Sequence, residues 1–177
     1  MKNFILSIHV FILAISTVQA DHISLAEIRE EFYEATIDSK IAVTLFQKIE
    51  KINDPSPLVL AYKGATQAIL TKTVWNPITK LSLLKASRNN FNKAVIKDEL
   101  NLEIRFLRFS VQHHIPVYLG FSKNLKEDKH HILNNLTQFS NLSLSKRVLN
   151  YIFKFLIDSE RYTQEEVAMI KDQVGRT

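Results

Sequence analysis

The stretch "NLEIRFLRFSVQHHIP" (residues 101–116) decides the fold class. At about 100° per residue, its polar side chains fall into two stripes on opposite sides of a helix. Apolar residues occupy the two flanks between these stripes, which is typical of a helix packed between two neighbours. The stretch therefore predicts the inner helix of a helical stack. One polar stripe contains Asn101, Arg105, Arg108 and Gln112, and the other contains Glu103, Ser110 and His114.

Composition supports an all-α fold outside this stretch as well. The 177 residues include three Gly and four Pro, too little turn chemistry for a multi-stranded sheet. None of the glycines stands in a phosphate-cradling loop or a dinucleotide fingerprint, so no nucleotide cofactor is expected. We expect one domain over residues 21–177 and no cofactor.

Apolar residues recur at helical spacing between clear start and stop signals. Ser24 and Glu27 have the spacing of a capping box, as do Thr163 and Glu166. We favour two helices over one long helix before the break at "NDPSP". Further helices are predicted over residues 57–73, 77–98, 101–115, 123–139, 142–160 and 163–174, which makes about four antiparallel hairpins.

The first 20 residues have the pattern of a cleaved signal peptide. Lys2 precedes an apolar run from Phe4 to Val18, and Val18 and Ala20 fit the small-residue pattern before a signal-peptidase site. An uncleaved membrane anchor is the alternative, but the run is shorter than a spanning helix needs. The chain contains no Cys, so it is not a lipoprotein acylated on a terminal Cys. We expect a periplasmic or secreted protein without a transmembrane segment after cleavage.

The charge balance gives little support for nucleic-acid binding. The formal net charge is +5, and the basic residues form no dense block along the sequence. We therefore expect no nucleic-acid partner.

Two segments carry a family resemblance. "YKGATQAILTK" (residues 62–72) and "SRNNFNKAVIKDELN" (residues 87–101) place Gly64, Ser87, Phe91 and Ala94 at positions that resemble a degenerate tetratricopeptide repeat. Leu60 stands where the repeat has Trp, and Glu99 where it has the closing Pro. Residues 58–140 are also similar to an uncharacterised family of exported bacterial helical proteins. The resemblance implies a tetratricopeptide-like stack in a bacterial envelope protein and brings no catalytic residue.

Arg105 and Arg108 are the first candidates for partner contact. On a rigid helix their guanidinium groups suit a carboxylate or phosphate, because the donor fork matches two oxygens. With Gln112 they would form the floor of a groove beside Tyr118 and Trp75, gripping an acidic segment of an envelope protein. The alternative is that the arginines pair internally with carboxylates of adjacent helices.

Other candidate sites are weaker in the sequence. Glu127 and His130 have the Glu-x-x-His spacing of metal-binding bundles, and His114 could join them in a metal-dependent hydrolase. The second motif of such bundles is missing, so solvated histidines are the alternative, and no nucleophile elbow marks another hydrolase. Trp75 and Tyr118 could plug the helix ends instead of binding a partner. "RVLNYIFKFLI" (residues 147–157) could be a buried helix or the face of a structural homo-oligomer.

Overall fold

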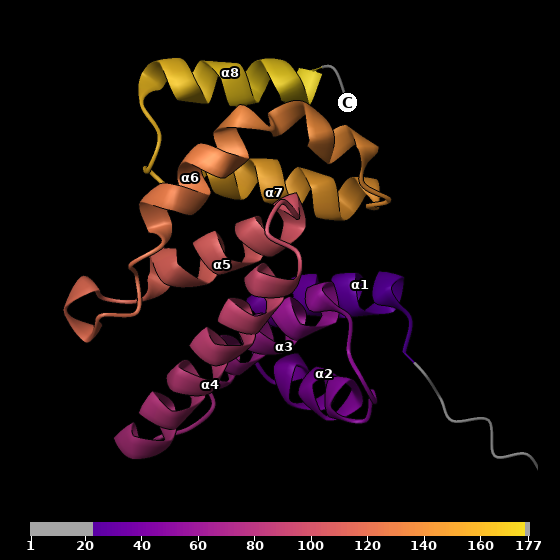
Figure 1. The fold of residues 1–177 in the computed structure, drawn as a ribbon, viewed down its shortest axis with the longest axis vertical. Coiled ribbons are helices and arrows are strands. Elements are labelled where there is room, and N and C mark those ends of the chain that lie inside the picture. Colours follow the sequence, from indigo (N-terminus) through magenta and orange to yellow (C-terminus); the bar gives the residue numbers. More distant parts are fainter. Residues whose placement is uncertain (1–22, 176–177) are drawn as a thin grey trace, which may run out of the picture.

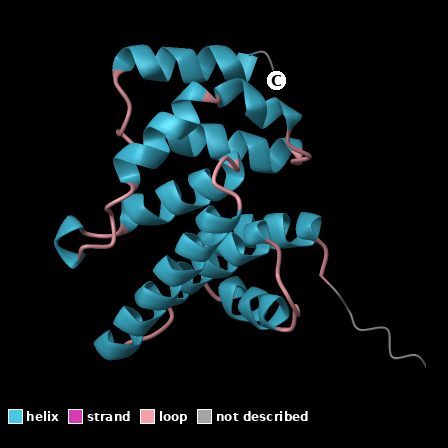
Figure 2. Cartoon of the chain, in the orientation of Figure 1, coloured by secondary structure: helices cyan, strands magenta, loops and turns pink. Residues whose placement is uncertain are grey.

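The computed structural model describes residues 23–175, and these form an all-helical protein without a strand (Figures 1 and 2). The prediction of an all-α fold is confirmed. Its elements are α1 (Leu25–Ile37), α2 (Ile41–Glu50), α3 (Pro57–Leu70), α4 (Pro77–Lys97), α5 (Leu102–His114), α6 (Leu125–Asn134), α7 (Lys146–Asp158) and α8 (Gln164–Gly175), with two 3-10 helices, η1 (Val117–Leu119) and η2 (Leu136–Asn141).

Side-chain caps explain where most helices begin. Ser24 accepts from the amide of Glu27 at 3.2 Å, and the Glu27 carboxylate accepts from the amide of Ser24 at 2.7 Å, which completes the predicted capping box. Thr163 and Glu166 form the same reciprocal pair before α8. Pro57 and Pro77 occupy the first turns of α3 and α4, where the missing N–H costs nothing.

Two predicted helices differ from the structure at their ends. The segment 123–139 is divided into α6 and η2, because the Asn135 side-chain amide donates to the carbonyl of His131 at 2.7 Å and ends the first helix. The next helix begins at Lys146 rather than Leu142, because Ser145 caps it by accepting from the amide of Val148 at 3.1 Å. Both differences come from short polar side chains that bond to nearby backbone.

Most helices contact the next helix in the chain, and α5 lies at the centre of the protein. The contacts between successive helices include α1–α2, α2–α3, α3–α4, α5–α6 and α7–α8, and α5 also contacts α3 and α4. Helix α1 contacts both α3 and α7, so the first hairpin touches the last one. In Figure 1, α6, α7 and α8 form the upper part, α1–α4 the lower part, and α5 lies between them. The buried side chains form one core cluster that draws on all eight α-helices.

Gly64 explains the close approach of α3 and α4. A Cβ atom at this position would lie 3.0 Å from the carbonyl oxygen of Ser87 and 3.4 Å from the ring of Phe91. A side chain at this position would require the α4 backbone to shift by a few tenths of an ångström, and glycine avoids this. The small-residue position in the sequence pattern is therefore a helix–helix contact.

The predicted signal peptide, residues 1–20, lies outside the described residues. Within residues 23–175, none of the helices combines the length and the apolar character needed to cross a membrane.

Candidate functional site

Helix α5 is buried on its apolar flanks and, up to Gln112, on both polar stripes. The apolar residues Leu102, Ile104, Phe106, Leu107 and Phe109 all belong to the core, as expected for a helix between neighbours. The polar residues Glu103, Arg105, Arg108, Ser110 and Gln112 are buried as well. Helix α6 packs against the side that bears the arginines. Each polar group of this helix therefore needs a partner inside the protein.

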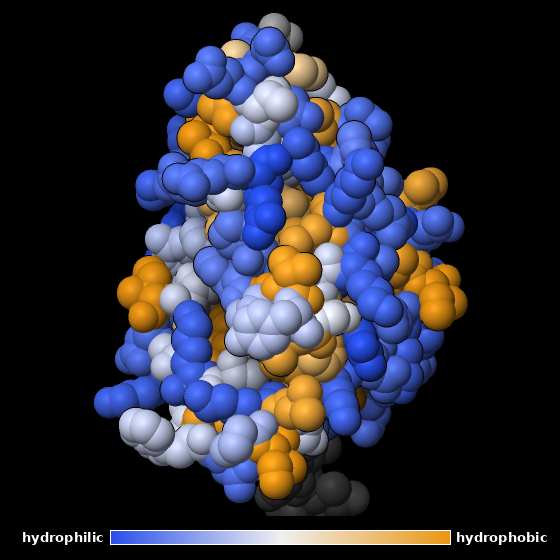
Figure 3. Space-filling view, turned by 90° about the vertical axis from the view of Figure 1, so that its left-hand side faces the viewer, coloured by the Kyte–Doolittle hydropathy of each residue, from blue (hydrophilic) through white to orange (hydrophobic). Residues whose placement is uncertain are grey.

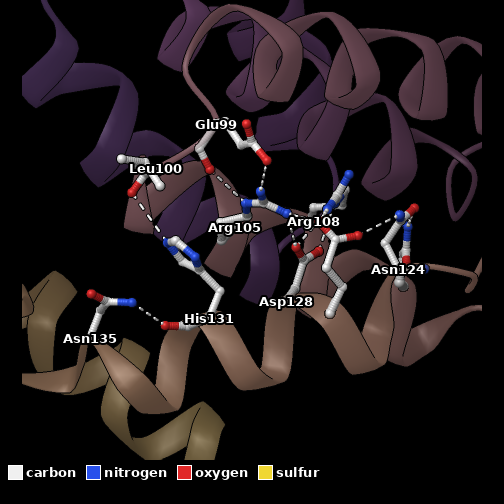
Figure 4. A network of polar contacts seen from close by, with 10 residues as sticks. Glu99, Leu100, Arg105, Arg108, Asn124, Asp128, His131 and Asn135 are labelled. Atoms are coloured by element: carbon white, nitrogen blue, oxygen red, sulfur yellow. Dashed lines mark hydrogen bonds and ion pairs between the residues drawn. The ribbon is translucent and has the colours of Figure 1, made fainter.

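Arg105 and Arg108 meet two carboxylates of α6 (Figure 4). Arg108 donates to both oxygens of Asp128, from Nε to Oδ2 at 2.7 Å and from Nη2 to Oδ1 at 2.6 Å. Arg105 donates to Asp128 Oδ1 at 3.1 Å, to Glu127, and to the backbone oxygen of Glu99 at 2.9 Å. We call these five residues the arginine–carboxylate network. It matches the internal-pairing alternative for both arginines.

Burial and charge oppose each other in this network. Each arginine is 3% exposed and Asp128 is 0% exposed. Burial raises the pKa of Asp128 above its usual value, against the lowering effect of Arg108 and Arg105. Hydrogen bonding from Arg105 lowers the pKa of Glu127, which is more exposed. Both oxygens of Asp128 accept, which is the geometry of an ionised carboxylate.

The opposite polar stripe of α5 is paired in the same manner. Arg29 of α1 donates to both oxygens of Glu103, at 2.8 and 2.7 Å, and Tyr62 of α3 donates to Oε1 at 2.6 Å. Burial is the first cause that raises the pKa of Tyr62, and the Glu103 charge adds to it. This contact links α1, α3 and α5, so Glu103 joins three helices by one side chain.

Gln112 is also committed to the fold. Its side-chain oxygen accepts from the backbone amide of Asn124 at 3.0 Å, and its amide nitrogen donates to Asn124 Oδ1 at 3.4 Å. These bonds satisfy groups at the start of α6. The three polar residues predicted for a groove floor are therefore interior residues.

The two aromatic residues of the predicted contact set lie on the surface. Trp75, between α3 and α4, is 96% exposed, and Tyr118 in η1 is 86% exposed. Neither residue plugs a helix end in this arrangement. Of the five residues predicted to bind a partner, these two offer side chains to solvent.

The candidate metal ligands do not form a cluster. No three His, Cys, Asp or Glu side chains lie together in a metal-binding group anywhere in the described part of the chain. Glu127 bonds to Arg105. His114 lies at the end of α5, where burial lowers its pKa together with the charges of His113 and Lys72. The structure thus does not bring Glu127, His130 and His114 together.

Helix α7 uses its apolar residues inside the protein. Val148, Ile152, Phe153 and Leu156 are buried. Phe155 packs edge-on against Phe106 and Phe109 of α5, with ring centroids 5.7 and 6.2 Å apart. The buried-helix interpretation accounts for these residues without a second copy.

The charge is distributed unevenly along the chain, although the basic residues form no dense block. Residues 55–97, which we call the basic hairpin, contain seven Lys or Arg and no Asp or Glu. Residues 98–175 contain ten basic and ten acidic residues, and residues 23–54 contain four basic and seven acidic ones. The net positive charge thus belongs to α3, α4 and their connection. The gap between Asp54 and Asp98 is the signal in the sequence that could have found it.

Most cations of the basic hairpin have no partner. Lys63 pairs with Glu50 at 3.1 Å, and Arg88 lies over the ring of Phe121 at 4.8 Å. No described residue forms a side-chain hydrogen bond or ion pair with the other five cations. These five are Lys72, Lys80, Lys85, Lys93 and Lys97, and all are exposed.

Exposed apolar side chains accompany these cations at the start of α4. Ile78 and Leu81 are exposed one turn apart, directly after Trp75. Figure 3 views the molecule from the side on which η1 and the start of α4 lie in Figure 1, and apolar side chains gather down the centre of that face between hydrophilic margins. An apolar patch with a charged margin is typical of an interaction surface.

In comparisons with protein-family models, curated proteins and solved structures, no match to this chain was found.

Proposed function

We propose that this protein is an exported, tetratricopeptide-like helical binding module that recognises an acidic segment of an envelope protein. The observation that carries the proposal is the basic hairpin, with seven cations and no carboxylate over residues 55–97. The close contact of α3 and α4 at Gly64, the small-residue position of the repeat pattern, supports the architecture.

The contact surface of this proposal is the exposed start of α4, not the interior arginines. Lys80 and Lys85 lack partners among the described residues, and Trp75, Ile78 and Leu81 are exposed beside them. Cations attract and orient an acidic segment, while the apolar side chains supply most of the buried area. Arg105 and Arg108 then hold α6 against α5 and keep the scaffold rigid.

A display library of random peptides tests the preference for acidic segments directly. We expect the protein to enrich peptides that combine Asp or Glu with aromatic or aliphatic residues. Fluorescence anisotropy of a selected peptide should show affinity that falls as salt rises, because the exposed charges are screened. A selection without acidic enrichment would contradict the proposal.

Charge reversal locates the surface. The double variant Lys80→Glu, Lys85→Glu should lower the affinity for the selected peptide by about tenfold, since two favourable surface contacts become repulsive. The matched control is Lys126→Glu, Lys171→Glu, which reverses two exposed lysines of α6 and α8. An equal loss of peptide affinity in both double variants would show that α4 is not the contact surface.

A further inference from the structure

A cavity of about 480 Å³ lies where α1, α3, α4, α5 and α7 converge. Its volume falls in the range of small-molecule sites, about 300–1,000 Å³. None of the residues predicted from the sequence to bind a partner lines it. The lining residues are Phe32, Thr36, Ala68, Ile69, Thr71, Lys72, Leu84, Ser110, Val111, His114, Ile115 and Tyr151.

Most hydroxyl groups on the inner wall of this cavity already have hydrogen-bond partners within the protein. Three of its four hydroxyl groups bond to the backbone of their own helices: Thr36 donates to the carbonyl of Tyr33 at 2.6 Å, Thr71 to that of Ala68 at 2.7 Å, and Ser110 to that of Leu107 at 2.9 Å. The fourth, on Tyr151, pairs with the Thr36 side chain. The protons of Thr36, Thr71 and Ser110 are therefore not available to a ligand. A ligand body that fits this wall is a hydrocarbon.

Lys72 is the one charged group of the lining at neutral pH. Lys72 and His114 are the basic groups, and no Asp or Glu lines the cavity. Lys72 has no ion-pair partner among the described residues. Burial lowers the pKa of His114, and repulsion from His113 and Lys72 lowers it further. An unpaired cation at an apolar cavity favours an anionic group and opposes a cationic one.

We propose that this cavity is a binding site for a small amphiphilic carboxylate, with its hydrocarbon body against Ile69, Val111 and Leu84 and its carboxylate at Lys72 and His114. The site is independent of the acidic segment proposed for α4, because neither Lys80 nor Lys85 lines it. It also gives His114 a role that needs no metal.

Three probes that differ only in their head group test the proposal on the full mature chain: decanoate, 1-decanol and decylamine. Isothermal titration calorimetry below the micelle concentration should show one decanoate bound per chain. The alcohol should bind about fivefold more weakly, because it lacks the charge interaction with Lys72, and the amine more weakly still. In NMR spectra, decanoate should shift the resonances of the His114 ring and the Val111 methyl groups.

Two variants distinguish the contribution of the apolar wall to binding from that of the Lys72 charge. Ala68→Phe fills the cavity and should abolish binding of decanoate and decanol alike. Lys72→Met, on the rim, should remove the preference for decanoate over decanol, while Lys80→Met, outside the lining, should keep it. Circular dichroism and melting confirm that each variant is folded. Absence of decanoate binding, equal affinity for all three probes, or unchanged binding to folded Ala68→Phe would overturn the proposal.

Discussion

Helices α4 and α5 contact each other, yet they use their cations in opposite ways. On α5, Arg105 and Arg108 are buried and each donates to carboxylates of α6. On α4, Lys80, Lys85 and Lys93 are exposed and have no partner among the described residues. The difference follows from solvation, since a buried guanidinium requires a counter-charge while an exposed ammonium is hydrated.

The contrast between α4 and α5 indicates which charges of a helical scaffold can form a contact surface. Arginines within an apolar stretch attract attention in a sequence, but their surroundings force them into pairs within the fold. Charges without a partner are the ones left to attract another molecule. Four predictions test this division of roles, from the largest expected effect to the smallest.

Asp128→Ala should be the most damaging change in the buried network. It leaves Arg105 and Arg108 without their shared carboxylate, and breaking a buried ion pair costs about 3–5 kcal/mol. Urea denaturation measures the loss in the free energy of unfolding. The control is Glu99→Gln, because the Glu99 carboxylate is exposed and lies 3.8 Å from Arg105, so its removal should cost under about 1 kcal/mol. Equal losses would remove the distinction between buried and exposed charge.

Gly64→Ala should loosen the hairpin that presents the lysines. The new Cβ would lie 3.0 Å from the Ser87 carbonyl oxygen, so the backbone of α4 must shift by a few tenths of an ångström. Overpacking outweighs the gain in helix propensity, and we expect a net loss of about 1 kcal/mol in thermal or urea unfolding. Gly175→Ala is the control, since an added Cβ there meets no heavy atom within 4 Å. A more stable Gly64→Ala variant would show that α4 accommodates the added Cβ atom without strain.

Acid should weaken the network through Glu127. Hydrogen bonding from Arg105 lowers the pKa of Glu127 in the folded protein. The stability that this group contributes is therefore present above the unfolded pKa of about 4.3 and is lost as pH falls through the lower folded pKa. Because Glu127 is half-exposed, the effect should stay under about 1 kcal/mol.

The difference between wild type and Glu127→Gln isolates this contribution. Urea unfolding at several pH values should give a difference that shrinks on acidification below about pH 4. A difference that is constant with pH would show that Glu127 gains nothing from Arg105.

Lys80→Met with Lys85→Met should change stability least. Neither ammonium group forms a hydrogen bond or ion pair with another described residue, so the free energy of unfolding should stay within about 0.5 kcal/mol of the wild type. The same double should bind a selected acidic peptide less tightly. A clear loss of stability would mean that these lysines serve the fold, as the α5 arginines do.

Local signals in the sequence predicted much of the helical architecture. The Ser24–Glu27 and Thr163–Glu166 boxes and the prolines at the starts of α3 and α4 place helix starts correctly, because caps act over three or four residues. The division at Asn135 was missed because it depends on one side-chain bond to the His131 carbonyl. Local signals therefore predicted the presence of the helices more accurately than the residues at which they end.

The roles of the site residues could be assigned only from the tertiary structure, because their partners are distant in the sequence. The sequence placed Arg105 and Arg108 on one stripe of α5 and Glu127 in a later helix, but it offered Glu127 as a metal ligand rather than an arginine partner. Asp128, which binds both arginines, was not singled out at all. The cavity among α1, α3, α4, α5 and α7 combines residues 32 to 151, and no local pattern connects them.

The sequence by itself determined the helical class, most helix starts and the acid-free composition of residues 55–97, because each depends on neighbours along the chain. Tertiary structure decided which charges are neutralised and which stay free. Pairing depends on which helix covers which face, and α6 covers the arginines of α5 while the start of α4 is left exposed. The same positive charge thus stabilises the interior at one place and is available to a partner at the other.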